Sequence, residues 1–125
     1  MVYRYHKPPT QRQLKVGEEI RAVISEIILR GDIFAPGFEK LLVTVSEVRI
    51  SSDLMNATVF LTFTDTVDVK AVIAYFNLIA PQIRKMVTAK VKLRFSPELK
   101  FIFDETSKQA AKIEALFKMV EKKDK

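Results

Sequence analysis

The stretch NLIAPQIRKMV, Asn77–Val87, places a proline in the middle of a helical pattern. Apolar residues lie at helical spacing on both sides of Pro81. A proline inside a helix removes a backbone donor, clashes with the preceding turn and costs about 3 kcal/mol, whereas the first position of a helix accommodates it well. The stretch therefore predicts two helices that meet at an angle, with Ala80 at the junction and a short second helix over Gln82–Ala89.

The second helix begins without an obvious capping side chain. The backbone N–H groups of Gln82 and Ile83 need a partner, which could be water, the Asn77 side chain or a ligand anion. Arg84 and Lys85 follow one turn later, so free amides, the positive end of the helix dipole and two cations could together hold a phosphate. A water-filled bend explains the same pattern, and both interpretations stay open.

Basic charge is concentrated directly after this junction. The chain has 125 residues and a net charge of +6, yet positions 84–94 contain no acidic residue. Lys90, Lys92 and Arg94 alternate with apolar residues, which predicts one basic side if this segment is extended. A smaller basic excess lies in positions 1–24. Segregated basic charge indicates a polyanionic partner, most often nucleic acid, with solubility alone as the alternative.

The first helix has a clear start in the sequence. Pro8 and Pro9 prevent an earlier start, and Thr10 with Gln13 three residues later matches a capping box. The apolar spacing then continues to about Arg30–Gly31. We therefore expect a helix from Thr10 to about residue 30.

Three segments are predicted to form β-strands. Residues 40–50 and 56–63 are rich in β-branched and apolar residues, and the short link between them predicts an antiparallel pair. The alternation of inward and outward residues shifts near Ser46–Glu47, which indicates a bulge. A third strand is expected over residues 97–103.

Two further helices complete the pattern, in the order α-β-β-α-α-β-α. Asp65 or Thr66 is the expected cap of the helix that precedes the junction, and Asp104, Thr106 or Ser107 is the expected cap of a last helix. The last helix has an apolar face made of Ile113, Leu116, Phe117 and Val120. We predict one α+β domain over residues 1–125, with a three-stranded sheet packed against helices and flexible ends at 1–9 and 122–125.

The composition argues against an enzyme or a metalloprotein. There is no cysteine, His6 is the only histidine, and three glycines are too few for a phosphate-cradling loop. We predict no catalytic residue, no metal, no cofactor and no small-molecule substrate. No apolar run reaches the length of a membrane span and the start lacks a signal peptide, so we expect a cytoplasmic protein with no membrane partner.

Two motifs resemble bacterial ribosome-binding factor A. These are VRISSDLMNATVFLTF at Val48–Phe63 and RFSPELKFIFD at Arg94–Asp104. The segment Thr10–Ile33 is similar to the first helix of alphaproteobacterial members, and the resemblance extends over roughly residues 10–120. It implies a type II KH-like fold without the glycine loop of RNA-binding KH domains. Members of the family usually have an Ala-any-Gly kink where this chain has Ile79, Ala80 and Pro81.

The resemblance also implies a function. Members of this family are non-catalytic assembly factors that bind the free 30S ribosomal subunit and its 16S rRNA. They assist late maturation and rRNA processing, and they support growth in the cold. We expect this chain to act as a monomer and to anchor RNA phosphates. The predicted RNA-binding residues are Arg84, Lys85, Lys90, Lys92, Arg94, Arg12 and Lys15. The alternative is a basic protein-interaction module that binds an acidic protein partner; a small enzyme is a third reading, opposed by the missing nucleophile and metal sets.

Overall fold

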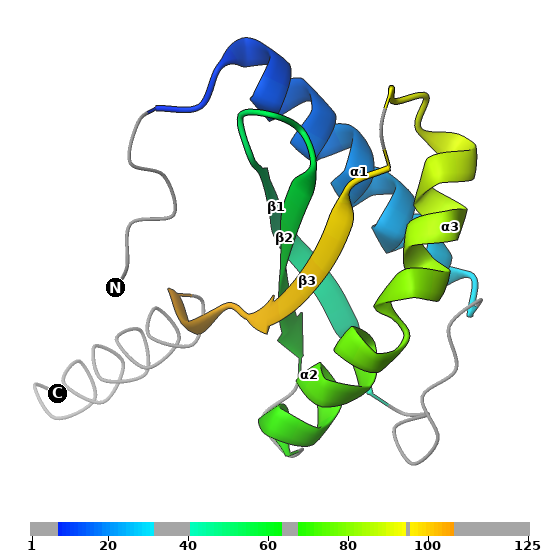
Figure 1. Cartoon of the computed structure of the whole chain (residues 1–125). Helices are drawn as coiled ribbons and strands as arrows, with labels where there is room; N and C mark the ends of the chain where they lie inside the picture. The colour runs from blue at the N-terminus through cyan, green and yellow to red at the C-terminus, as the bar shows by residue number, and fades with distance from the viewer. Residues whose placement is uncertain (1–7, 32–40, 64–67, 95, 107–125) are drawn as a thin grey trace, which may run out of the picture.

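A computed structural model describes residues 8–31, 41–63, 68–94 and 96–106 (Figure 1). The elements are α1 (Gln11–Leu29), β1 (Val43–Ile50), β2 (Asn56–Phe63), α2 (Val69–Leu78), α3 (Ala80–Lys90) and β3 (Glu98–Phe103). This order confirms the predicted type II KH-like fold. The predicted last helix is described only at its start, where Glu105 and Thr106 are helical and Asp104 Oδ1 accepts a hydrogen bond from the Thr106 N–H at 3.0 Å, which confirms Asp104 among the predicted caps. Its apolar residues Ile113, Leu116, Phe117 and Val120 lie outside the described residues, as do the predicted flexible ends apart from Pro8 and Pro9.

The predicted capping box is present at the start of α1. The Gln13 N–H donates to Thr10 Oγ1 at 3.1 Å, and the Thr10 N–H donates to Gln13 Oε1 at 2.8 Å. Two backbone donors that lack helical partners are satisfied in this way. The helix therefore begins where the sequence predicts.

The three strands form one sheet in the order β1-β2-β3. β1 and β2 are antiparallel, as predicted, and β3 lies parallel to β2. The register shifts between Val45 and Glu47, which confirms the predicted bulge. Because of this extra residue, Val45 and Val48 are both buried although they are three positions apart. β1 begins at Val43, three residues later than predicted.

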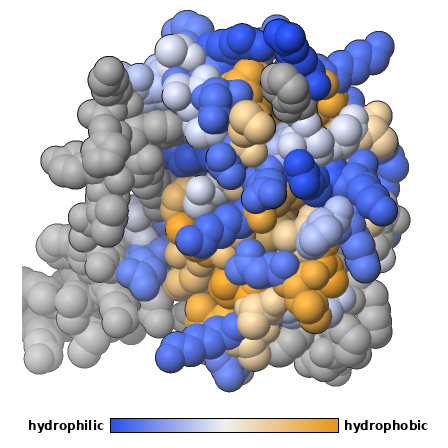
Figure 2. Space-filling view, viewed as in Figure 1, coloured by the Kyte–Doolittle hydropathy of each residue, from blue (hydrophilic) through white to orange (hydrophobic). Residues whose placement is uncertain are grey.

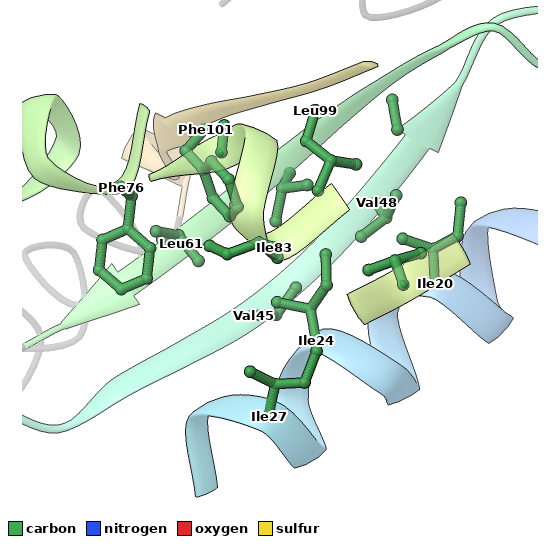
Figure 3. Close-up of a cluster of buried hydrophobic side chains, with 14 of the residues drawn as sticks. Ile20, Ile24, Ile27, Val45, Val48, Leu61, Phe76, Ile83, Leu99 and Phe101 are labelled. Carbon is green, nitrogen blue, oxygen red and sulfur yellow. The ribbon is translucent and has the colours of Figure 1, made fainter. Parts of the chain in front are cut away.

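All three described helices pack on one face of the sheet and share one core with it (Figures 1 and 3). α1 lies across β1, while α2 and α3 lie across β3. In Figure 3, isoleucines of α1 point toward Val45 and Val48, and Ile83 of α3 lies near Leu61 and Phe101. Ile83 and Phe101 are both fully buried. Packing of Ile83 in the core therefore holds α3 against the sheet.

The cap of α2 is Asp68, so the predicted caps Asp65 and Thr66 are wrong. The carboxylate of Asp68 accepts a hydrogen bond from the Ala71 N–H at 3.2 Å. Asp65 and Thr66 lie outside the described residues.

The junction between α2 and α3 is at Ile79, one residue earlier than predicted. Ile79 ends α2 and precedes α3 with φ −95° and ψ 5°, while Ala80 is buried as the first residue of α3. Pro81 therefore takes the second helical position, and α3 begins two residues before the predicted start and ends one residue after the predicted end. A bent helix pair is confirmed at this place in the chain.

The amides that follow the junction are already paired. The N–H groups of Gln82 and Ile83 both donate to the Ile79 carbonyl, at 3.0 and 3.1 Å. The prediction that they lack a backbone partner is wrong, because the extra helical residue at Ala80 brings the Ile79 carbonyl within reach. The Asn77 side chain bonds to β3 instead of to these amides. The basis for a phosphate site at the junction is therefore removed.

Candidate nucleic-acid interface

A groove of about 490 Å³ lies at the end of the molecule opposite the α2–α3 junction. Three chain segments form its walls: the first turns of α1, the β1–β2 turn, and the segment 92–94 after α3. We call it the basic groove. It is lined by Arg12, Lys15, Val16, Glu19, Ser52, Asp53, Leu54, Lys92, Leu93 and Arg94.

Four of the predicted RNA-binding residues meet in the basic groove, namely Arg12, Lys15, Lys92 and Arg94. All four are exposed. Arg12, Lys15 and Lys92 form no ion pair with any described residue, so their charges are available to a ligand. Figure 2 shows strongly hydrophilic residues across this end of the molecule, with small hydrophobic areas among them.

Gln13 and Gly17 fix α1 against β1 and thereby place Arg12 and Lys15. The buried Gln13 side chain donates from Nε2 to the Ile50 carbonyl at 3.1 Å, just before the β1–β2 turn. One turn later, Gly17 lies so close to β1 that a Cβ would meet the Val48 carbonyl oxygen at 2.7 Å. The two walls made by α1 and the hairpin are therefore directly attached.

The β1–β2 turn is organised by Asp53. Its Oδ1 accepts hydrogen bonds from Ser51 Oγ at 2.6 Å and from the Met55 N–H at 3.0 Å. These two bonds, that of Ser51 first, hold the pKa of Asp53 below its ordinary value of 3.8. The next residue, Leu54, has φ +62°, a left-handed conformation that a leucine rarely adopts.

Arg84 positions the third wall and does not line the groove. Its Nη2 donates to the Ser96 carbonyl at 2.6 Å, and its Nε donates to Ser96 Oγ at 3.1 Å. This fork links α3 to the segment that carries Lys92 and Arg94. Arg84 remains a predicted RNA-binding residue, but its guanidinium already has two partners on the chain.

Lys85 and Lys90 are exposed on α3 and do not line the basic groove. Lys90 is the last residue of α3, so the predicted alternation of Lys90 with Lys92 and Arg94 along one extended segment is wrong. The kink residues Ile79, Ala80 and Pro81 lie at the other end of α3, about 16 Å away along an 11-residue helix. The structure therefore separates the kink from the cluster of cations.

Three residues of this site were missed by sequence reasoning about function. The sequence pattern predicts Gln13 only as a cap, because nothing in it indicates the bond to Ile50, 37 positions away. Leu54 and Leu93 contribute apolar surface to the groove. Their placement depends on tertiary packing, and a left-handed leucine has no signal in the sequence.

Two other kinds of feature, a metal site and a membrane span, are not found in the described part of the chain. Among residues 8–31, 41–63, 68–94 and 96–106, no three carboxylates or histidines gather as a possible metal site. Within the same residues, no helix is long and apolar enough to cross a membrane.

Comparison with known proteins places the chain in a family. A family model described as ribosome-binding factor A matches residues 12–117. The ribosome-binding factor A of Paramagnetospirillum magneticum is 40% identical over 110 residues, covering 88% of this chain and 78% of the relative. That of Roseobacter denitrificans is 41% identical over 98 residues, covering 78% of this chain and 68% of the relative.

Solved structures agree with the fold. The crystal structure of ribosome-binding factor A from Thermus thermophilus has a TM-score of 0.61 at 18% identity, covering 72% of this chain and 93% of that chain. A homology model of the Thermus thermophilus protein, fitted into a cryo-EM map of its complex with 30S, has a TM-score of 0.61 at 19% identity; the match covers 75% of this chain and 97% of that chain. The chain belongs to the ribosome-binding factor A family.

Proposed function

We propose that this protein binds the free 30S ribosomal subunit through its 16S rRNA and assists late maturation of that subunit. The observation that carries the proposal is the basic groove, where Arg12, Lys15, Lys92 and Arg94 converge from two distant parts of the chain. Membership of the ribosome-binding factor A family and the 30S complex of the Thermus thermophilus relative support the choice of partner.

The proposed mechanism is non-catalytic. Exposed cations neutralise phosphates of the rRNA backbone, release counterions and hold the protein against the immature subunit. The groove is built from both a helix start and a loop, so the cations face one ligand from several directions. In this role the protein acts as a monomer in the cytoplasm, supports rRNA processing and is needed most in the cold, where misfolded rRNA rearranges slowly.

Binding to purified small subunits tests the role of the groove. The variant combines Lys15→Glu with Lys92→Glu, and its affinity is measured by co-sedimentation at several salt concentrations. We expect at least about a tenfold loss, and a salt slope that is shallower by about 0.7 for each lost phosphate contact on single-stranded RNA.

The matched control combines Lys70→Glu with Lys100→Glu. These lysines are exposed on α2 and β3, outside the groove, and the substitutions change the net charge by the same amount. We expect the control to bind nearly as well as the wild type. Equal losses in both variants would show that net charge, and not the groove, drives binding.

A second experiment tests the cellular role. A bacterium that lacks its own ribosome-binding factor A receives the wild type, the groove variant or the control. We expect the groove variant alone to leave unprocessed 16S rRNA and slow growth in the cold. Pull-down after nuclease treatment separates the alternative, because binding to an acidic protein partner would survive removal of RNA.

A further inference from the structure

The basic groove has an apolar component that phosphate binding does not require. Leu54 and Leu93 line it beside the cations, and both side chains are only partly buried. Val16 of α1, a buried residue, lines the same groove. A surface that recognises only a phosphate backbone needs cations and donors, so this apolar floor calls for a ligand with an apolar face.

Leu54 occupies its place in the groove at a conformational cost. Its φ of +62° lies in the left-handed region, which glycine and asparagine adopt far more easily than leucine does. Strained backbone is tolerated where the surrounding structure holds it, and it is often found at binding sites. Part of the strain is offset by packing of Leu54 against the core. The Leu54 side chain therefore lines the groove although its backbone conformation would favour glycine at this position.

The groove also contains two carboxylates. Asp53 and Glu19 are exposed on its walls, close to the four cations. A carboxylate repels a bare phosphate, but it accepts hydrogen bonds from the amino and imino groups of nucleic-acid bases. The three kinds of group match one nucleotide. The cations suit its phosphate, the carboxylates suit the edge of its base, and the apolar side chains suit the face of the base. The volume of about 490 Å³ lies within the range of about 300–1,000 Å³ that small-ligand pockets occupy.

We propose that the basic groove captures a single unpaired nucleotide of the RNA. The base lies against Leu54 and Leu93, its edge faces Asp53, and the flanking phosphates meet Lys15 and Lys92. Apolar side chains hold extruded bases in other proteins by the same physics. The RNA is then single-stranded or bulged at this contact, since a base inside a duplex cannot reach the floor. This inference rests on the proposed function, in which the partner is RNA.

Three RNA duplexes of about 14 base pairs test the inference with the full-length protein. One is fully paired, one carries a single bulged nucleotide at its centre, and one carries an abasic ribose at the bulge. Affinities are measured by fluorescence polarisation at fixed salt, with each of the four bases in the bulge. We expect the bulged duplex to bind about tenfold more tightly than the other two, because one face of the base leaves water when it packs against the apolar side chains.

Variants then locate the nucleotide. Leu54→Gly relieves the backbone strain and removes the side chain, so we expect it to bind the bulged duplex about tenfold more weakly while its affinity for the fully paired duplex is unchanged. Circular dichroism detects whether Leu54→Gly alters the fold. If it does, the affinity of Leu93→Ala for the bulged duplex tests the same contact. Met55→Ala is the matched control, because Met55 is an exposed apolar residue of the same turn that does not line the groove.

Failures of the two proposals can be told apart. Equal affinity of the wild type for all three duplexes overturns nucleotide capture and leaves RNA binding intact. A preference for the bulge that survives in both Leu54→Gly and Leu93→Ala also overturns it, because the base then lies elsewhere. If the wild type binds none of the duplexes and the small-subunit binding is insensitive to the groove charges, the proposed function fails as well.

Discussion

The side-chain amide of Asn77 takes the place of a neighbouring strand along the outer edge of β3, where it bonds to both backbone groups of Phe101. Asn77 Oδ1 accepts from the Phe101 N–H at 2.8 Å, and Asn77 Nδ2 donates to the Phe101 carbonyl at 2.9 Å. Phe101 is fully buried, so these backbone groups have limited access to water. The last turn of α2 is fixed to the sheet just before the chain bends at Ile79.

Replacing Asn77 is therefore expected to destabilise the fold. Asn77→Ala leaves the Phe101 N–H and carbonyl without partners, and we expect a loss of about 1–3 kcal/mol in the free energy of unfolding. Urea denaturation measures it. Gln82→Ala, at an exposed position of α3, serves as the control and should stay within about 0.5 kcal/mol of the wild type. Equal stability of both variants would contradict a structural role for Asn77.

Gln13 performs two tasks that substitutions can separate. Gln13→Glu keeps the oxygen that accepts from the Thr10 N–H but loses the Nε2 donor to the Ile50 carbonyl, whereas Gln13→Ala loses both. We expect each variant to lose about 1–3 kcal/mol of stability, because a buried polar group is left unpaired. Both should also weaken RNA binding, since α1 carries Arg12 and Lys15 into the groove. Retained stability in Gln13→Glu would show that the bond to Ile50 is dispensable.

Gly17→Ala should destabilise the protein although alanine is the better helix former. In an exposed helix this change gains about 1 kcal/mol, but here the new methyl group would meet the Val48 carbonyl oxygen at 2.7 Å. We expect overpacking to dominate, with a net loss of about 1–3 kcal/mol in thermal or urea unfolding. Ala22→Gly, exposed on the same helix, reports the propensity effect alone. A stabilised Gly17→Ala would mean that α1 can move away from β1 at little cost.

Arg84→Lys distinguishes a positioning role from a direct phosphate contact. Lysine keeps the charge but cannot reproduce the two-pronged bond to Ser96. We expect a loss of about 1–2 kcal/mol in stability and weaker binding to small subunits, because the segment with Lys92 is no longer held. Lys85→Gln, on the same helix but outside the groove, should leave stability unchanged. Full binding and full stability in Arg84→Lys would restore the prediction of a simple charge contact.

Asp53 gives the β1–β2 turn a dependence on pH. Its pKa is lowered by the hydrogen bonds from Ser51 and Met55, so the folded protein favours the ionised carboxylate. A lowered pKa adds stability that is present above the ordinary value of 3.8 and is lost as the pH falls through the folded value. Asp53→Asn retains an acceptor but does not titrate. We expect melting temperatures of the wild type to fall more steeply below about pH 4 than those of Asp53→Asn, and parallel curves would argue against this role.

Local patterns explain why much of the fold is predictable from the sequence. The capping box at Thr10, the bulge near Ser46 and the helix break at Pro81 each depend on residues within a few positions of one another. Their physical causes are a side-chain oxygen, a shift in alternation and a missing N–H. The exact junction was misplaced by one residue because Ala80 joins α3 when it packs into the core, a tertiary effect that spacing does not reveal.

The candidate site was only partly predictable, because it is assembled across the chain. Charge along the sequence identified the cations, but it grouped Arg84 with the groove residues, whereas the guanidinium of Arg84 bonds to Ser96 and does not line the groove. Arg12 and Lys92 are 80 positions apart and line one groove. Packing of α1 on β1 and on α3 brings these two segments together, and a lone glycine in a helical pattern does not predict the close approach of Gly17 to β1.

Gln13 and Gly17 attach α1 to the hairpin, so the residues that hold these two walls together are different from the cations that face a ligand. Two walls of the groove belong to the same packed body as the core, while the third is attached through Arg84 and Ser96. Substitutions at the exposed Lys92 can therefore change the dissociation rate of a complex at little cost in stability, whereas Leu93 also packs against the core. Ligand affinity can therefore be adjusted at Lys92 without altering the packing that holds α1 on β1.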